Sequence, residues 1–230
     1  MLSSNTLPPY ALHSPRKRWL PRRAVTVALS LSLSLAVAAS TSWFMTRTSI
    51  VDLGSQQQLS KSGLLQAWAN GAVIVMIRHA ERCDSAPGPC LDDPAGITVA
   101  GSQAAGRVGE GLKHLGLADA DLLSSPKVRT QQTAHFILGQ PVATREWIGQ
   151  CDGSFPAQAL AAKRTEHNLV LVTHSGCVDQ FARQQNVAGG ERDSGYASAL
   201  FVSVDDNGKA RILGRLNEPA WQRVLASAAR

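Results

Sequence analysis

Three short segments of the chain combine histidine, arginine and serine in the way that phosphoryl transfer requires. They are RHAE at 78–81, SSPKVR at 124–129 and THSG at 173–176. Arginine presents a planar fork of N–H donors that matches phosphate oxygens two at a time. A neutral imidazole can attack phosphorus and hold the phosphoryl group as a covalent intermediate. These residue types therefore predict a phosphoryl-transfer site, provided that the fold brings the segments together.

Each segment follows a predicted strand. The runs at 72–77 and 168–173 are continuously apolar, which is typical of strands covered on both faces, and a shorter strand is predicted at 120–125. Predicted strands and helices alternate, which indicates an α/β fold: a three-layer α/β/α sandwich with a largely parallel central sheet. Parallel strands end at one edge of their sheet, so two histidines, His79 and His174, and two arginines, Arg78 and Arg129, should meet there.

The other elements are predicted from periodicity and turn signals. Strands at 199–204 and 210–216 should form a hairpin, because DDNG at 205–208 favours a tight turn. Another strand is predicted at 142–148, and Ser125 is expected to cap a helix that has Pro126 in its first turn. Helices are predicted at 59–70, 98–116, 127–138 and 155–167.

The net charge of +6 is concentrated at the N-terminus. Five positive side chains lie in the first 23 residues, which contain no acidic residue, so the rest of the chain carries only +1. A basic surface for nucleic acid is therefore not indicated.

An uncharged, mostly apolar run at 24–39 follows the basic cluster and ends in small residues. This order is typical of a secretory signal. The alternative is an uncleaved anchor, since the uncharged stretch continues to residue 45 and can span a bilayer. Either interpretation predicts a periplasmic protein, which contacts the inner membrane only through this segment and only if the segment is uncleaved. The predicted organisation is a signal or anchor at 1–39, a connector with a short helix at 40–70 and the main domain at 71–230.

All four cysteines lie in the part predicted to be exported. An even number in an oxidising compartment favours two disulfides, with three possible pairings. Cys83 and Cys90 enclose the Pro/Gly-rich loop DSAPGP, so we expect them to pair, and Cys151 then pairs with Cys177 by elimination. A zinc site is the competing interpretation, but no CxxC or Cys/His spacing supports it. We expect neither a metal nor another cofactor.

RHAE after an apolar strand, SSPKVRTQQTA and VTHSG resemble the motifs of the histidine phosphatase (phosphoglycerate-mutase-like) superfamily. The resemblance covers roughly residues 70–180. It implies that His79 is the phosphorylated nucleophile and that His174 is a second histidine at the phosphoryl group. It also implies that Arg78 and Arg129 bind the phosphate.

Other stretches resemble, more narrowly, the periplasmic lipopolysaccharide core heptose(II)-phosphate phosphatases. They are VIVMIRHAERCD with a second cysteine seven residues on, DPAGITVAG, a later Gln-Cys pair and THSGC. The resemblance implies an exported phosphomonoesterase that acts on a phosphorylated small molecule or on the lipopolysaccharide core. The alternatives are a general periplasmic phosphatase, a phosphohistidine phosphatase, and an inactive module that only binds phosphate or an anionic glycan.

The general acid is the least defined part of the predicted site. Many members of the superfamily use an acidic residue after the third strand, or one directly after the second histidine, where this chain has Ser175. Asp152 is the best candidate for the acid and Glu81 the next; the alternative role for Asp152 is that of a turn former. Arg82 is a further candidate for binding the phosphate group. The alternative is that it is only a charged residue of the loop.

Overall fold

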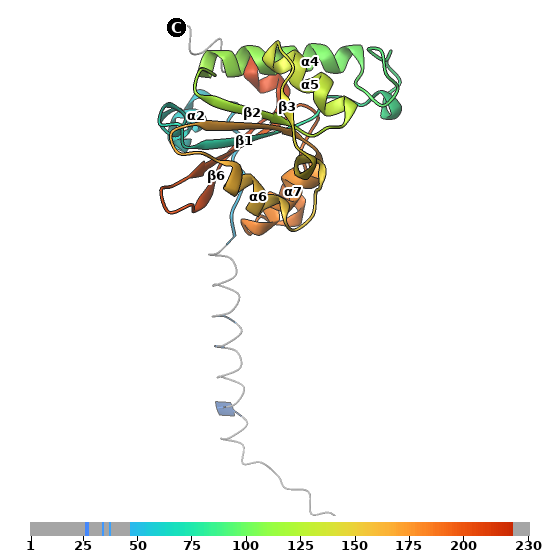
Figure 1. The fold of residues 1–230 in the computed structure, drawn as a ribbon. Coiled ribbons are helices and arrows are strands. Elements are labelled where there is room, and N and C mark those ends of the chain that lie inside the picture. The colour runs from blue at the N-terminus through green and yellow to red at the C-terminus, as the bar shows by residue number, and fades with distance from the viewer. Residues whose placement is uncertain (1–25, 28–33, 35–36, 38–46, 223–230) are drawn as a thin grey trace, which may run out of the picture. The chain divides into compact units, whose positions relative to one another are not determined.

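The computed structural model describes residues 26–27, 34, 37 and 47–222 (Figure 1). The chain divides into two compact units, Met1–Thr46 and Arg47–Arg230. The predicted export segment lies almost wholly outside the described residues. Within the described ranges, no helix has the length and apolar character needed to cross a membrane. The predicted main domain belongs to the second unit.

A six-stranded sheet forms the centre of this unit, in the order β3–β2–β4–β1–β5–β6. The four strands from β3 to β1 are parallel, whereas β5 is antiparallel to β1 and β6 to β5. The predicted largely parallel sheet and the predicted hairpin are therefore confirmed. The strands are β1 (Val73–Arg78), β2 (Ala120–Ser124), β3 (Ala143–Thr144), β4 (Asn168–Thr173), β5 (Ala199–Val204) and β6 (Ala210–Leu216).

Helices cover both faces of the sheet, which makes the three layers that the sequence predicts (Figure 1). The helices are α2 (Gln56–Ser62), α3 (Leu64–Ala69), α4 (Val99–Leu115), α5 (Val128–Leu138), α6 (Phe155–Ala162) and α7 (Ser175–Gln184), with short 3₁₀ helices η1 (Cys83–Ser85), η2 (Glu146–Gly149) and η3 (Gly189–Glu191).

The position of strand β1 between two helical layers explains why its sequence does not alternate between apolar and polar residues. Val75 and Ile77 pack into the core beneath α4 and α5, while Ile74 and Met76 face the opposite core beneath α6 and α7. All four side chains are fully buried. A strand with a helical layer on each side requires apolar residues at every position.

The register of the parallel strands brings the predicted site together. Arg78 of β1 pairs with Thr173 of β4, so His79 and His174 are the next residues at the same edge. The backbone N–H of His79 donates to the carbonyl oxygen of Thr173 at 2.9 Å. Ser124 of β2 pairs with Val172, which places Ser125 at this edge too.

Several predicted elements differ from those observed. The strand predicted at 142–148 is limited to β3, and the chain then turns into η2, which buries Ile148. The helix predicted at 59–70 divides at Gly63, which has a φ of 76°, and the one predicted at 155–167 ends at Ala162. Helix α5 begins at Val128 rather than at Pro126.

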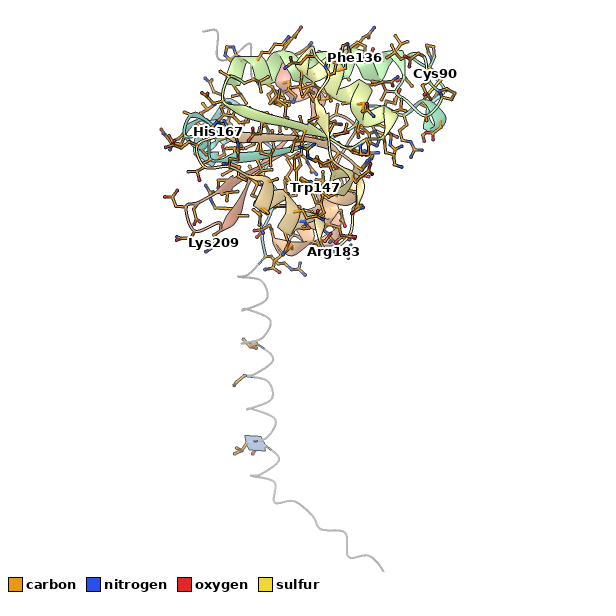
Figure 2. The ribbon with its side chains drawn as sticks, in the orientation of Figure 1. Cys90, Phe136, Trp147, His167, Arg183 and Lys209 are labelled. Atoms are coloured by element: carbon orange, nitrogen blue, oxygen red, sulfur yellow. A yellow bond between two sulfur atoms is a disulfide. The ribbon has the colours of Figure 1, made fainter. Side chains whose placement is uncertain are left out.

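Both expected disulfides are present. Cys83 and Cys90 close the loop that follows β1, with their Cα atoms 5.1 Å apart, and Figure 2 shows Cys90 in this loop. Cys151 and Cys177 join the segment after η2 to the first turn of α7, with their Cα atoms 4.1 Å apart. Both cross-links therefore lie in segments that follow the carboxyl ends of strands.

Candidate active site

His79 is a buried, neutral histidine with one ring nitrogen available for chemistry. Its side chain is only 4% exposed, and Nδ1 lies 2.8 Å from the carbonyl oxygen of Ala80. A carbonyl oxygen can only accept, so Nδ1 carries the proton and Nε2 keeps its lone pair. Burial lowers the pKa of His79 from 6.5 to about 3; the Ala80 carbonyl opposes this shift, and the charges of His174, Arg129 and Arg78 add to it.

His174 holds its proton on the other ring nitrogen. Nδ1 lies 3.4 Å from Arg129 Nη2, which can only donate, so the proton belongs on Nε2, 3.0 Å from Ser125 Oγ. Burial lowers the pKa of His174 to about 4, with smaller contributions from Arg129, Lys127 and Arg82. The ring centroids of His79 and His174 are 5.3 Å apart in an edge-to-face arrangement, so the two imidazoles are in contact.

The two arginines have N–H donors that are not used in hydrogen bonds within the described residues. Arg78 donates from Nη1 to the carbonyl oxygen of Ser194, and Arg129 approaches His174. The Nε atoms of both arginines are buried and have no hydrogen-bond partner among the described residues. Burial lowers the pKa of Arg129, followed by the charge of Arg82, but a guanidinium stays protonated in proteins. Buried donors without partners beside a neutral histidine indicate a site for an anion.

Tyr196 supports Arg78, and sequence reasoning missed it. The guanidinium carbon of Arg78 lies 4.0 Å from the Tyr196 ring centroid, a cation–π contact, and the ring is 5.8 Å from that of His79. The next residue, Ala197, is fully buried and has a φ of 53°, which strains a residue with a Cβ. Its N–H donates to the carbonyl oxygen of His79.

Ser125 is the second residue that the sequence did not reveal as part of the site. The sequence predicts a cap of α5 at this position, yet the N-cap position is Lys127, which makes no capping hydrogen bond with its side chain, and the Ser125 hydroxyl contacts His174. Ser125 is fully buried. A Cβ added to Gly149 would lie 2.9 Å from Ser125 Oγ and 3.9 Å from His174 Nε2, so η2 approaches the pair closely at a glycine.

Arg82 and Asp84 form an ion pair at the margin of the site. The Asp84 carboxylate raises the pKa of Arg82, and the Arg82 guanidinium lowers that of Asp84. Arg82 is close enough to Arg129 and His174 to lower their pKa values. Arg82 is therefore a positive charge near the proposed phosphate-binding residues, and its guanidinium is already paired with Asp84.

The two candidate acids have different surroundings. The Asp152 side chain is exposed and accepts hydrogen bonds from the N–H and the hydroxyl of Ser154, and these bonds lower its pKa. Such contacts favour the turn-forming role of Asp152, because a general acid must be protonated. Glu81 is half-buried, lies two residues from His79 and accepts from the Thr98 hydroxyl at 2.9 Å.

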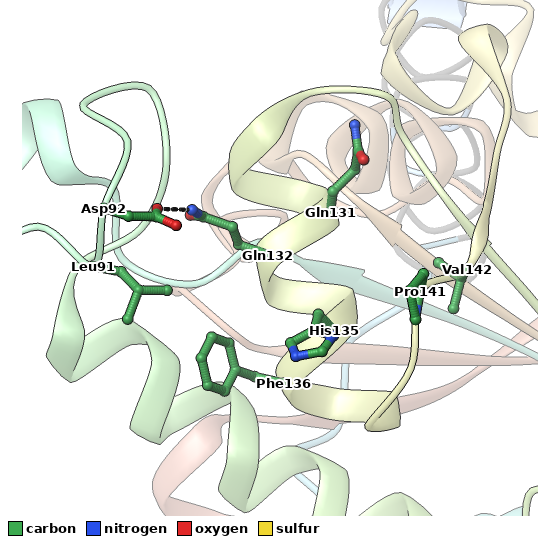
Figure 3. A pocket seen from close by; sticks show the side chains of 8 residues that line it. All are labelled: Leu91, Asp92, Gln131, Gln132, His135, Phe136, Pro141 and Val142. Carbon is green, nitrogen blue, oxygen red and sulfur yellow. Dashed lines mark hydrogen bonds between the residues drawn. The ribbon is translucent and has the colours of Figure 1, made fainter.

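A separate cavity of about 440 Å³ lies between the loop after β1 and helix α5 (Figure 3). Its lining includes Leu91, Gln132 and Phe136, and none of the predicted site residues. Gln132 accepts from the N–H of Ile97 and donates to Asp92, so it fastens the loop to α5. We assign the chemistry to the His79 edge rather than to this cavity, because the described residues that line the cavity include no arginine to bind a phosphate group.

The buried histidines should make the fold sensitive to acid. Both have a folded pKa below the 6.5 of the unfolded chain, so below about pH 6.5 the unfolded chain binds more protons. Stability should fall as the pH drops from 7 towards 4, by up to about 1.4 kcal/mol per pH unit for each histidine. Urea unfolding of His79→Gln should show a shallower loss than the wild type. His135→Gln, at an exposed position, is the matched control; equal slopes for the wild type and His79→Gln would contradict this account.

The chain is similar to known proteins both in sequence and in fold. No protein-family model matches the chain. The lipopolysaccharide core heptose(II)-phosphate phosphatase of Shigella boydii serotype 4 (strain Sb227) is 34% identical over 151 residues, which cover 64% of this chain and 69% of that protein. Its namesake from Escherichia coli O139:H28 (strain E24377A / ETEC) is 35% identical over 136 residues, covering 58% of this chain and 66% of that protein. The matches thus span about two thirds of these relatives' own length.

Among solved structures, phosphoserine phosphatase from Entamoeba histolytica in complex with 3-phosphoglyceric acid superposes with a TM-score of 0.50 at 15% identity. The superposition covers 65% of this chain and 98% of that protein, and it supports the fold alone.

Two histidines and two arginines meet at the carboxyl edge of the parallel sheet. Together with the similarities above, this arrangement places the chain in the histidine phosphatase superfamily, with the phosphoglycerate-mutase-like fold. It is a phosphoric monoester hydrolase of that class. Within the superfamily, the chain belongs to the lipopolysaccharide core heptose(II)-phosphate phosphatase family.

Proposed function

We propose that this chain is an exported phosphomonoesterase that works through a phosphohistidine on His79, with lipopolysaccharide core heptose phosphate as its substrate. One observation carries the proposal: a buried, neutral His79 stands beside Arg78 and Arg129, whose Nε–H donors lack partners among the described residues. The names of the relatives supply the substrate class. The complete set of histidines and arginines favours an enzyme over a module that only binds anions.

In the first half-reaction, His79 Nε2 attacks phosphorus and the bond from phosphorus to the sugar oxygen breaks. The Nδ1–H bond to the Ala80 carbonyl oxygen holds the ring in place and stabilises the positive charge that develops on it. Arg78 and Arg129 stabilise the charge on the equatorial phosphate oxygens. The negative phosphoryl group also favours protonation of His174, which can then donate to it.

We assign the proton donor for the sugar oxygen to Glu81. It follows His79 by two residues, and its carboxyl group is held by the hydroxyl of Thr98 at 2.9 Å. In the second half-reaction the same carboxylate accepts a proton from water as the water oxygen attacks phosphorus and the Nε2–phosphorus bond breaks. The products are the free sugar hydroxyl and inorganic phosphate, and His79 is again neutral.

Export is supported by the sequence of the N-terminal segment and by the two disulfides. A basic cluster followed by an apolar run is the pattern of a secretory signal. Disulfides persist in oxidising compartments such as the periplasm, where the inner membrane would be contacted only through that segment.

A panel of phosphorylated substrates tests the proposed function. The purified protein should release phosphate from lipopolysaccharide that carries core heptose phosphate, and from hexose phosphates, faster than from a phosphohistidine peptide. Phosphate release is measured directly, and His79→Ala serves as the control for contaminating activity. Equal rates on all substrates would indicate a general phosphatase. Release from the phosphohistidine peptide alone would indicate a phosphohistidine phosphatase.

A further inference from the structure

A small polar pocket adjoins the His79 edge on the side of Arg78. Its volume is about 310 Å³, enough for a group the size of one sugar ring. Its lining includes Ser175, which directly follows His174, and Ser194, whose carbonyl oxygen holds Arg78 Nη1. Two lining residues of the pocket are therefore direct neighbours of the proposed phosphoryl site, Ser175 through the chain and Ser194 through its bond to Arg78.

Two side chains of this pocket have polar atoms without partners. Arg192 is 16% exposed, and its Nε and Nη1 atoms are buried without a hydrogen-bond partner among the described residues. The Ser194 side chain is 1% exposed, and its hydroxyl also lacks a partner there. Arg192 Nε lies 3.3 Å from Asp179 Oδ1, close enough for an ion pair. Buried donors of this kind are rare in folded proteins, so each of them calls for a polar partner.

The charged side chains that line the pocket indicate which kind of ligand it can bind. Asp179 and Asp193 line it together with Arg192, and Asp179 also pairs with Arg183 outside it. Two carboxylates would repel a second anionic group, but they accept hydrogen bonds from hydroxyl groups. The guanidinium and Ser194 offer donors on the same wall. Sugar hydroxyls, which both donate and accept, match this mixture better than a second phosphate or an apolar chain does.

We propose that this pocket binds the hydroxyl groups of the sugar whose phosphate is bound at His79, and that Arg192 is its specificity-determining residue. The inference rests on the proposed function, because it needs a phosphate ester at that edge. Arg192 donates from Nη1 to the sugar, and the Asp179 carboxylate, 3.3 Å from Nε, keeps the guanidinium oriented.

Two substrates with the same kind of ester isolate the contribution of the hydroxyls. Glucose 6-phosphate and butyl phosphate are both phosphates of primary alcohols, so the bond that breaks is alike. We expect the wild type to prefer glucose 6-phosphate, measured as the ratio of the two kcat/KM values. Arg192→Ala should lower this ratio by about 10- to 100-fold, the effect of losing charge-assisted hydrogen bonds.

A second variant and a matched control keep the test independent of folding defects. Ser194→Ala removes a hydroxyl that no described residue satisfies, so it should fold normally and lower the ratio by about 3- to 10-fold. Arg183→Ala removes the other arginine bound to Asp179, 3.0 Å away, at a position outside the pocket and 59% exposed, on α7 (Figure 2). It should leave the ratio within about twofold of the wild type.

The outcomes separate the two proposals. A wild-type ratio near one, or an equal loss on both substrates in Arg192→Ala and no effect of Ser194→Ala, would overturn the sugar subsite and leave the phosphatase assignment intact. Failure of the wild type to hydrolyse any phosphate ester through His79 would overturn the proposed function, and this inference with it.

Discussion

Replacement of His79 by alanine should reduce phosphate release by about 10³-fold or more, because the variant has no nucleophile to accept the phosphoryl group. The remaining arginines would still bind phosphate, so affinity for inorganic phosphate should change far less than turnover. The fold should persist, since removing a buried imidazole takes away a group whose protonation opposes folding. The measurement is phosphate release with p-nitrophenyl phosphate, alongside thermal unfolding of both proteins.

The covalent intermediate gives this prediction a second readout. Rapid mixing of the wild type with substrate, followed by denaturation, should leave an acid-labile phosphate on the peptide that contains His79. His135→Ala, which changes an exposed histidine, should retain both the label and the activity. A folded His79→Ala protein that keeps more than a few per cent of the activity would show that another group attacks phosphorus.

Glu81→Gln should slow the hydrolysis of alkyl phosphates by about 10²- to 10⁴-fold, the usual contribution of a general acid. With p-nitrophenyl phosphate the loss should be much smaller, because that leaving group needs little help from a proton. Asp152→Asn is the matched control, since Asp152 is exposed and its carboxylate is occupied by Ser154. It should affect both substrates little.

A comparison of the two variants assigns the acid. If Asp152→Asn, and not Glu81→Gln, shows a loss that depends on the leaving group, the role passes to Asp152. Equal losses of Glu81→Gln on both substrates would instead indicate that Glu81 positions the loop after β1 through its bond to Thr98.

The central strands could be predicted because their sequences carry a strong signal. VIVMI and LVLV are apolar at every position, a pattern typical of short strands buried on both faces. Once these strands are parallel neighbours, the residues after them must share an edge. The convergence of His79 and His174 is thus a consequence of chain geometry that a single sequence can reveal.

Contacts that depend on three-dimensional packing could not be predicted in this way. Ser125-Pro126 has the pattern of a helix start, but the hydroxyl of Ser125 contacts His174, 49 residues away. Tyr196 lies far from Arg78 in the chain, and no local pattern relates the two. The strand predicted at 142–148 is too long because its β-branched and aromatic residues fit η2 and the core beneath it equally well.

The positions of the disulfides bear on how firmly the site is held. Cys83–Cys90 and Cys151–Cys177 join segments that flank the His79 edge, and Cys177 is itself part of the apolar core beneath α6 and α7. Each cross-link therefore limits the movement of a segment next to one of the two histidines, Cys83–Cys90 after His79 and Cys151–Cys177 after His174.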